Sequence, residues 1–379
     1  MATTTIGVVR ERAPGEHRVA LVPEVVARLC PSGLDVLVEA SAGAGAWLPD
    51  SSYAEAGATV VSAAELDGQA DVLLCVQPPD PKRVAGLRAG QVLVGLLNPL
   101  ANPDLLDACV RRGVTAVSLD LLPRTLSRAQ AMDALTSQAN IAGYKAVLVA
   151  ADAYGRYFPM LMTAAGTARP AQVLVLGAGV AGLSAIGTAR RLGAQVTGYD
   201  IRPDSPAEVQ SMGARFLDLP GVTAGAGAGG YARELTDEER QAQQEALQRR
   251  VGDFDVVITT AQVPGRTPPV LVTEEAVKGM RPGSVVVDLA SGPLGGNVQG
   301  SVPDERTVVA DGITIIGAGN LPAAIAPGAS AAYARNIAAM VAHLVRDGAV
   351  VIDLTDEIQS AVVLTHGGAL VNPTLGGIR

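Results

Sequence analysis

The stretch Gly177-Ala178-Gly179-Val180-Ala181-Gly182 decides the fold of this 379-residue chain. It follows the apolar run 173–176 and opens the Ala-rich stretch 180–192, so it predicts a turn from a strand into a helix. In that setting Gly177 allows a tight turn, Gly179 lets the backbone approach a phosphate, and Gly182 lets helix and strand pack closely. The N-terminus of the helix adds unpaired N–H groups and partial positive charge. The stretch therefore predicts a Rossmann-type dinucleotide site, made by Gly177, Gly179, Val180, Ala181 and Gly182.

The next apolar run, residues 195–200, ends in Asp200. An acid about 20 residues after the glycines accepts hydrogen bonds from the adenosine ribose diol, and its charge repels a 2′-phosphate. The sequence therefore predicts NAD(H) rather than NADP(H) as the cofactor, with Ile201 and Arg202 in the same loop. Arg202 leaves an alternative open, because an arginine here can bind a 2′-phosphate. We expect it instead to flank the adenine or to face solvent.

The composition excludes several classes of protein. Apolar residues make up 48% of the chain and charged residues 17%, which is typical of a globular protein with a large core. The net charge of −8 disfavours nucleic acid as a partner. The apolar runs stop short of the 18 or so residues that a membrane span needs, so we expect a chain that does not cross a membrane by itself. The three cysteines are far apart, which indicates a reducing, cytoplasmic setting and predicts no metal site.

Short β-rich runs alternate with Ala-rich helical stretches along the chain, which is typical of βαβ units. The predicted fold class is α/β, with two Rossmann-like doubly wound parallel-sheet domains joined by long helices. The first domain comprises residues 1–135 plus 330–379 and is discontinuous; the second, dinucleotide-binding domain comprises 136–329. Strands are expected at 6–10, 71–77, 91–97, 114–120, 172–176, 195–200, 254–260, 284–290 and 313–316. Long helices are expected at 132–157 and 330–346, and the tail from 350 is polar and Gly-rich.

One segment breaks this alternation. Residues 221–230 form a Gly/Ala tract, followed by Tyr231 and a charged helix that runs through Arg250. A glycine-rich backbone loses much conformational entropy when it is ordered. The tract is either an idle linker or a mobile loop, about residues 221–233, that closes over bound cofactor with Tyr231 at its tip.

A polar cluster follows directly on the strand expected at 114–120, where α/β proteins place ligands. An alternative is structural: Ser127 and Gln130 have the spacing of a capping box, and Asp133 is placed to cap the long helix. Spacing alone favours this capping interpretation slightly. The cluster consists of Arg124, Ser127, Arg128, Gln130, Asp133 and Thr136.

The sequence offers no evident proton donor. A dehydrogenase that reduces a carbonyl needs an acid to protonate the developing alkoxide, usually His, Lys or Tyr. The three histidines, His17, His343 and His366, lie in expected polar loops or within a helix. Lys145 and Lys278 fall on expected helices.

At these residues the chain resembles the NAD(H)-binding component of proton-translocating NAD(P)+ transhydrogenase. The likeness covers essentially the whole chain. It is carried by the cluster from Arg124 to Thr136, by Val175-Leu-Gly-Ala-Gly-Val-Ala-Gly-Leu, Tyr199-Asp-Ile-Arg-Pro, Gln210-Ser-Met-Gly-Ala, Gly229-Gly-Tyr-Ala-Arg-Glu, Val257-Ile-Thr-Thr-Ala and Leu364-Thr-His-Gly-Gly.

The resemblance implies a homodimeric, peripheral component on the inner face of the cell membrane. It would dock on a membrane-spanning subunit and on a domain that binds NADP(H), and hydride would pass directly between the two nicotinamides while the membrane partner moves protons. Such a transfer creates no alkoxide, which explains the missing proton donor. By resemblance, Arg124, Gln130, Asp133 and Thr136 hold the nicotinamide and face the other nucleotide, whereas Gly230, Tyr231, Gln243 and Gln262 line the NAD site. The stretch is one residue longer here, so either Arg124 or Arg128 takes the arginine role.

Two alternatives stay open. Alanine dehydrogenase shares the fold and the pattern Arg18-Val-Ala-Leu-Val-Pro. It needs a lysine and a histidine for pyruvate and protons, and the matching strand ends carry Gln77 and Asn98. The other alternative is a module that binds NAD without catalysis.

Overall fold

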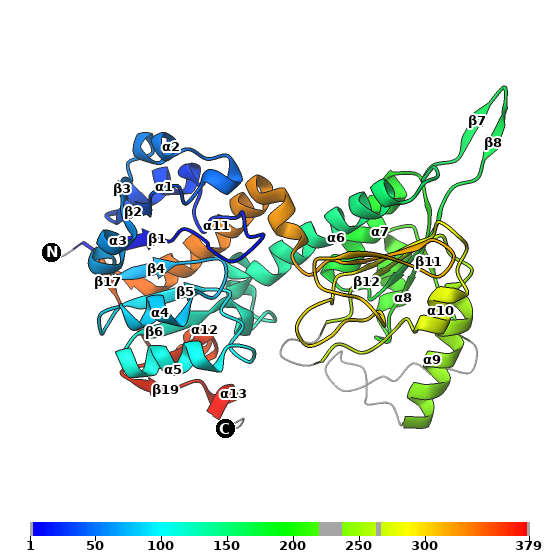
Figure 1. Ribbon diagram of the computed structural model, residues 1–379. Helices are drawn as coiled ribbons and strands as arrows, with labels where there is room; N and C mark the ends of the chain where they lie inside the picture. The colour runs from blue at the N-terminus through cyan, green and yellow to red at the C-terminus, as the bar shows by residue number, and fades with distance from the viewer. Residues whose placement is uncertain (1–2, 220–236, 263–266, 377–379) are drawn as a thin grey trace. The chain divides into compact units, whose positions relative to one another are not determined.

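The computed structural model describes residues 3–219, 237–262 and 267–376, and the chain divides into two compact units (Figure 1). The first unit comprises Met1–Gln138 and Pro322–Arg379, and the second comprises Ala139–Leu321. The sequence-based boundaries lie at 135/136 and 329/330. The loop expected at 221–233, with Gly230 and Tyr231, falls outside the described residues.

The first unit is built on an eight-stranded sheet in the order β19-β18-β6-β5-β4-β1-β2-β3. Strands β1 to β6 are parallel, whereas β18 runs antiparallel to β6 and β19 antiparallel to β18. The chain leaves β1 for β2 and β3 on one side and returns to β4, β5 and β6 on the other. The switch point of this sheet therefore lies between β1 and β4. The strands are β1 Thr5–Val8, β2 Asp35–Glu39, β3 Thr59–Val61, β4 Val72–Leu74, β5 Val92–Gly95, β6 Thr115–Ser118, β18 Val363–His366 and β19 Ala369–Leu370.

Side-chain alternation along these strands builds a core on each face of the sheet. Val72 and Leu74 of β4 point into one hydrophobic cluster, while Leu73 points into the other. Helix α11 covers the first face with Tyr333 and Ile337. The helices of this unit are α1 Pro23–Leu29, α2 Asp50–Glu55, α3 Ala63–Gln69, α4 Pro81–Ala85, α5 Pro103–Arg112, α11 Ala326–Leu344, α12 Glu357–Val362 and α13 Pro373–Gly376.

The second unit is built on a seven-stranded sheet in the order β11-β10-β9-β12-β13-β15-β14. All neighbours are parallel except β14 and β15. The switch point lies between β9 and β12, because the chain moves from β9 to β10 on one side and returns to β12 on the other. The strands are β9 Gln172–Leu176, β10 Gln195–Tyr199, β11 Arg215–Phe216, β12 Val256–Thr259, β13 Val285–Asp288, β14 Arg306–Val309 and β15 Ile313–Gly317.

Helix α6, Ala134–Ala153, carries the chain from the first unit into the second and corresponds to the helix expected at 132–157. After it comes the hairpin β7 Leu161–Thr163 and β8 Gly166–Ala168, which extends away from the sheet of the second unit (Figure 1). The other helices of this unit are α7 Val180–Arg191, α8 Ser205–Ser211, α9 Asp237–Val251 and α10 Glu274–Lys278.

The two sheets confirm the predicted α/β fold class. Two features differ from the expectation. The tail after residue 350, expected to be polar and Gly-rich, supplies β18 and β19 to the first sheet, because Val363 and Leu364 are fully buried against it. The β7–β8 hairpin lies where no strand was expected. No helix in the described part of the chain is both long and apolar enough to cross a membrane.

Candidate functional site

The glycine-rich turn joins β9 to α7 at the switch point of the second sheet. Gly177 has a φ of 99°, and a Cβ on it would lie 2.5 Å from Thr260 Oγ1. A Cβ on Gly182 would lie 1.8 Å from the carbonyl oxygen of Gly177. Only glycine fits at either position, because backbone conformation or backbone contact leaves no room for a side chain.

Gly179 differs from the other two glycines because the space beside it is open. No atom lies within 4 Å of a Cβ built on Gly179, and its φ of −71° suits any residue. It precedes α7, and no described side chain caps that helix. The first N–H groups of Val180, Ala181 and Gly182 are therefore available to an anion. This cradle fits the pyrophosphate of a dinucleotide.

Asp200 follows β10 at the same edge of the sheet and is tied to the turn. Its Oδ2 accepts the backbone N–H of Ala178 at 2.7 Å, and its Oδ1 accepts the backbone N–H of Arg202 at 2.9 Å. The side chain remains 11% exposed. Each carboxylate oxygen has a second lone pair, so the group can also accept hydrogen bonds from a ribose diol.

Arg202 is engaged by neighbouring acids. Its guanidinium lies 3.3 Å from Asp200 Oδ1 and 3.2 Å from Glu208 Oε2, and it donates to the carbonyl of Ala178 at 3.0 Å. These three contacts occupy the donors that a 2′-phosphate would need. Ile201, beside it, is 47% exposed and offers an apolar surface at the mouth of the turn.

The loop after β12 completes this edge, and part of it was missed from the sequence. Thr260 Oγ1 donates to the carbonyl of Gly177 at 3.1 Å. Asn297, fully buried, bonds both the N–H and the carbonyl of Ala261, each at 2.9 Å. Thr260 lies in one of the segments that carry the family resemblance, but no sequence signal marked Asn297, whose partners are distant along the chain.

Two glutamines expected near the cofactor are also placed. Gln243, on α9, donates to the hydroxyl of Tyr199 at 2.5 Å. Gln262 is exposed and donates to the carbonyl of Leu289 at 2.7 Å.

The polar cluster of the first unit is organised around Asp133. Its Oδ2 lies 3.0 Å from Arg124 Nε, and its Oδ1 accepts the backbone N–H of Thr136 at 2.8 Å. Arg124 Nη2 also donates to Thr136 Oγ1 at 2.5 Å. The structure therefore brings Arg124, Asp133 and Thr136 together, with the arginine half-exposed.

The other members of the cluster lie apart from that triad. Arg128 pairs with Asp356 at 2.7 Å, so Arg124 is the arginine that contacts Asp133. Gln130 is exposed, and its side chain has no hydrogen-bond partner in the described part of the chain. Ser127 opens a 3-10 helix, Ser127–Met132, that has no side-chain cap, so the predicted capping box is wrong. Asp133 does cap α6, as that interpretation expected.

The positions that alanine dehydrogenase would need are occupied differently. Gln77 Nε2 donates to Glu16 Oε2 at 3.1 Å, and Asn98 has a φ of 42° with its N–H on Asp120. Neither side chain exchanges protons near neutral pH. Within the described residues, no group of three His, Cys, Asp or Glu side chains is arranged to hold a metal ion.

Comparison with known proteins gives the family. The model of the alanine dehydrogenase/PNT N-terminal domain matches residues 7–142, and that of the C-terminal domain matches residues 146–373. The chain belongs to the alanine dehydrogenase/PNT family. The predicted resemblance to a transhydrogenase component is thereby confirmed at the level of the family and its relatives.

Within this family the transhydrogenase branch is the more similar. The first portion of NAD(P) transhydrogenase subunit alpha of Rhodospirillum rubrum, a separate chain, is 44% identical, covering 98% of this chain and 99% of the relative. The crystal structure of a transhydrogenase from Sinorhizobium meliloti is 41% identical with a TM-score of 0.85, covering 98% of this chain and 99% of that one. Alanine dehydrogenase of Bacillus subtilis is 31% identical, covering 84% of this chain and 80% of the relative.

Proposed function

We propose that this chain is the NAD(H)-binding component of a proton-translocating NAD(P)+ transhydrogenase. It would pass hydride between NAD(H) held here and NADP(H) held by a partner domain. The observation that carries the proposal is the turn at Gly179, which is open and uncapped beside Asp200. The names of the relatives supply the reaction class.

The second unit would hold the dinucleotide. The N–H groups that open α7 would bind the pyrophosphate, and Asp200 would accept hydrogen bonds from the adenosine ribose. The ion pairs of Arg202 with Asp200 and Glu208 favour NAD(H), because they leave little of its charge for a 2′-phosphate.

The first unit would position the nicotinamide. When bound, NAD(H) supplies or accepts a hydride at its nicotinamide ring. Arg124, Asp133 and Thr136 offer a donor, an acceptor and a hydroxyl for the carboxamide, and they are held rigidly by one another. The exposed Gln130 is free to contact the partner's nucleotide. No acid or base is required of these residues, and their contribution is orientation and the exclusion of water.

The proposal includes partners. The name "subunit alpha" in the relatives supports a multi-subunit enzyme, with this chain peripheral on the inner face of the membrane beside a membrane-spanning subunit. We also propose a homodimer. Three large apolar side chains around the β7–β8 hairpin support it, since Tyr157, Met160 and Met162 are 60%, 57% and 77% exposed.

Stopped-flow measurement of hydride transfer tests the function directly. The chain is mixed with NADH and with a partner domain loaded with an oxidised NADP analogue, and the absorbance of the reduced analogue is followed. Transfer that depends on both proteins and uses NADH supports the proposal. Binding of NADH without transfer would leave only a binding module, and reduction of pyruvate by NADH and ammonium would favour alanine dehydrogenase.

A further inference from the structure

A cavity of about 440 Å³ opens in the first unit at the carboxyl ends of β1 and β4. These two strands pair with each other, but the chain leaves them in opposite directions across the sheet. Doubly wound sheets bind ligands at such a switch point. The cavity is lined by residues 9–13 after β1, by residues 75–80 around and after the end of β4, and by side chains of α3 and α4.

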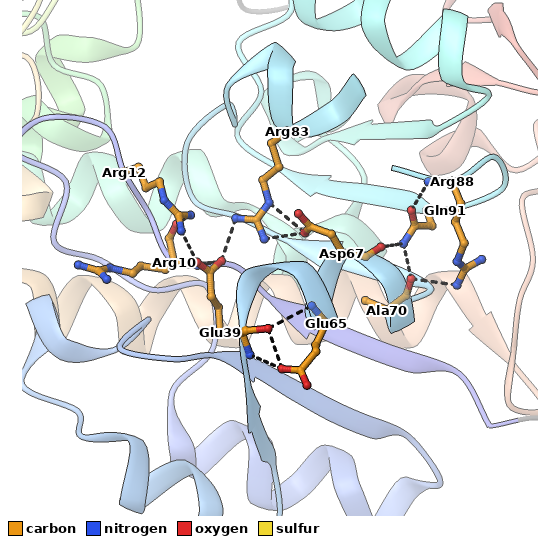
Figure 2. Close-up of polar contacts among 10 residues, drawn as sticks. Arg10, Arg12, Glu39, Glu65, Asp67, Ala70, Arg83, Arg88 and Gln91 are labelled. Carbon is orange, nitrogen blue, oxygen red and sulfur yellow. Dashed lines mark hydrogen bonds and ion pairs between the residues drawn. The ribbon is translucent and has the colours of Figure 1, made fainter. Parts of the chain in front are cut away.

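One wall of the cavity is a fixed network of ion pairs around Glu39 (Figure 2). This carboxylate is 3% exposed and accepts Arg12 Nη2 at 2.5 Å, Arg83 Nη1 at 2.8 Å and the backbone N–H of Arg10 at 3.0 Å. Arg83 also pairs with Asp67 at 2.7 Å. Two acids and two arginines therefore neutralise one another and hold the wall in place.

Two further cations of the lining are left over. Arg10 and Lys82 are exposed, and neither side chain has an ion-pair partner in the part of the chain that the structure describes. Figure 2 draws the guanidinium of Arg10 with no contact to the network around Glu39. The positive charge of these two side chains faces a cavity rather than a carboxylate.

The remaining acids of the lining are already engaged. Glu11 accepts the backbone N–H groups of Val76 and Gln77, at 2.6 and 3.4 Å. Burial raises the pKa of Glu11 to about 7, so part of its charge is absent at neutral pH. Asp80 accepts the backbone N–H of Lys82 at 2.8 Å. The lining therefore has an excess of available positive charge.

The rest of the lining is apolar. Ala63 contributes from α3, and Pro78 and Pro79 form a rigid edge after β4. Pockets for small molecules combine a largely apolar lining with a few placed polar groups, and their volumes start near 300 Å³. We propose that this cavity binds a small organic dianion, with its charged end between Arg10 and Lys82 and its apolar body against Pro78, Pro79 and Ala63. The site belongs to the first unit and does not depend on the proposed function.

Isothermal titration calorimetry of the full chain tests the proposal with phenyl phosphate, inorganic phosphate and succinate. Phenyl phosphate is expected to bind more tightly than inorganic phosphate, because only the former has an apolar body. The variants Arg10→Ala and Lys82→Ala should each weaken phenyl phosphate about tenfold, the effect of a lost charge-assisted hydrogen bond. Succinate against phenyl phosphate distinguishes a dicarboxylate from a phosphorylated ligand.

Two control variants locate the binding. Arg28→Ala removes an exposed charge from α1 of the same unit, outside the cavity, and should leave the affinity unchanged. Gly179→Ala places a methyl group in the open space of the dinucleotide turn, and it should also leave phenyl phosphate unaffected. The proposal is overturned if neither organic anion binds saturably at millimolar concentration. It is equally overturned if Gly179→Ala abolishes binding while Arg10→Ala and Lys82→Ala preserve it.

Discussion

Arg124 and Asp133 form an ion pair, Nε to Oδ2 at 3.0 Å, and the other oxygen of the same carboxylate caps α6 at the N–H of Thr136. Asp133 thus serves the end of a helix and the position of an arginine together. This double role explains why the sequence pattern fitted both a cap and a ligand loop. The two roles are separable by substitution, because the cap needs an oxygen and the ion pair needs a charge.

Asp133→Asn is expected to keep the cap and lose the hold on Arg124. Its amide oxygen still accepts the N–H of Thr136, so the free energy of unfolding should fall by less than about 1 kcal/mol. The rate of hydride transfer and the affinity for NADH should both fall, because Arg124 is no longer oriented. Urea denaturation and stopped-flow transfer measure the two effects. If Asp133→Asn is destabilised as much as Asp133→Ala while its transfer is normal, Asp133 is only a cap.

Gln130→Ala is expected to leave NADH affinity nearly unchanged and to slow hydride transfer by about 10- to 1000-fold. The side chain is exposed and has no partner among the described residues, so its loss removes no internal bond. Small misplacements of reacting groups nevertheless cost rates of this order. Ser127→Ala, in the same 3-10 helix and also exposed, is the matched control and should transfer hydride normally. A normal rate in reconstituted Gln130→Ala would refute the role proposed for this residue.

NADH should bind about tenfold more tightly than NADPH, or better, because Asp200 faces the ribose and a 2′-phosphate would meet its charge. Asp200→Asn keeps an oxygen for the N–H of Ala178, so the turn should persist while the discrimination narrows. Fluorescence titration with both nucleotides measures the ratio. Equal affinities in the unaltered protein would contradict the assignment of Asp200. Arg202→Ala should change the ratio little, since its charge is already paired.

The chain should form a dimer at micromolar concentration. Met162→Glu places a charge on the most exposed apolar residue of the hairpin, and it should shift the mass measured by light scattering toward the monomer. Trp47→Ser is the control, because Trp47 is 84% exposed but belongs to the first unit, away from the hairpin in the chain. A monomeric unaltered protein ends the dimer proposal, and a Met162→Glu dimer would place the interface elsewhere.

The sequence predicted what depends on neighbours along the chain. The strand, turn and helix around Gly177 are local, and the positive φ and the close contacts at this turn leave glycine as the one residue that fits. The fold class followed from the same alternation of short apolar runs and helical stretches. These features need no knowledge of distant pairing.

What the sequence missed depends on contacts between distant segments. Strand β18 exists because Val363 pairs with Val117 of β6, and nothing near residue 363 announces that partner. The choice between Arg124 and Arg128 was open for the same reason, since Asp356 is the residue that draws Arg128 away. The cavity at the switch point of the first sheet was also missed, because Glu39 and Arg83 meet only in the folded chain.

Glu11 and Glu16 should contribute to stability with opposite dependence on pH, although Gln77 contacts both. Burial raises the pKa of Glu11 to about 7. Burial alone would raise the pKa of Glu16 too, but hydrogen bonds and charge from Arg18 lower it to about 2. A raised pKa means that the folded state binds more protons than the unfolded one, so Glu11 costs stability progressively as pH rises from about 4.5 to about 7. Glu16 contributes stability that is complete above about 4.5 and is lost as pH falls toward 2.

Glu11→Gln removes the titration, so its stability relative to the unaltered protein should rise between about pH 5 and pH 7 and stay level above. The total change is expected to be at most about 3 kcal/mol. Glu16→Gln should be destabilised by a nearly constant amount across about pH 5 to 8, because Arg18 loses a charged partner that is ionised throughout this range. Urea denaturation of the three proteins at half-unit intervals of pH gives the two difference curves. A flat curve for Glu11→Gln would show that this carboxyl is ionised throughout, and the excess of positive charge in the neighbouring cavity would then be smaller by one.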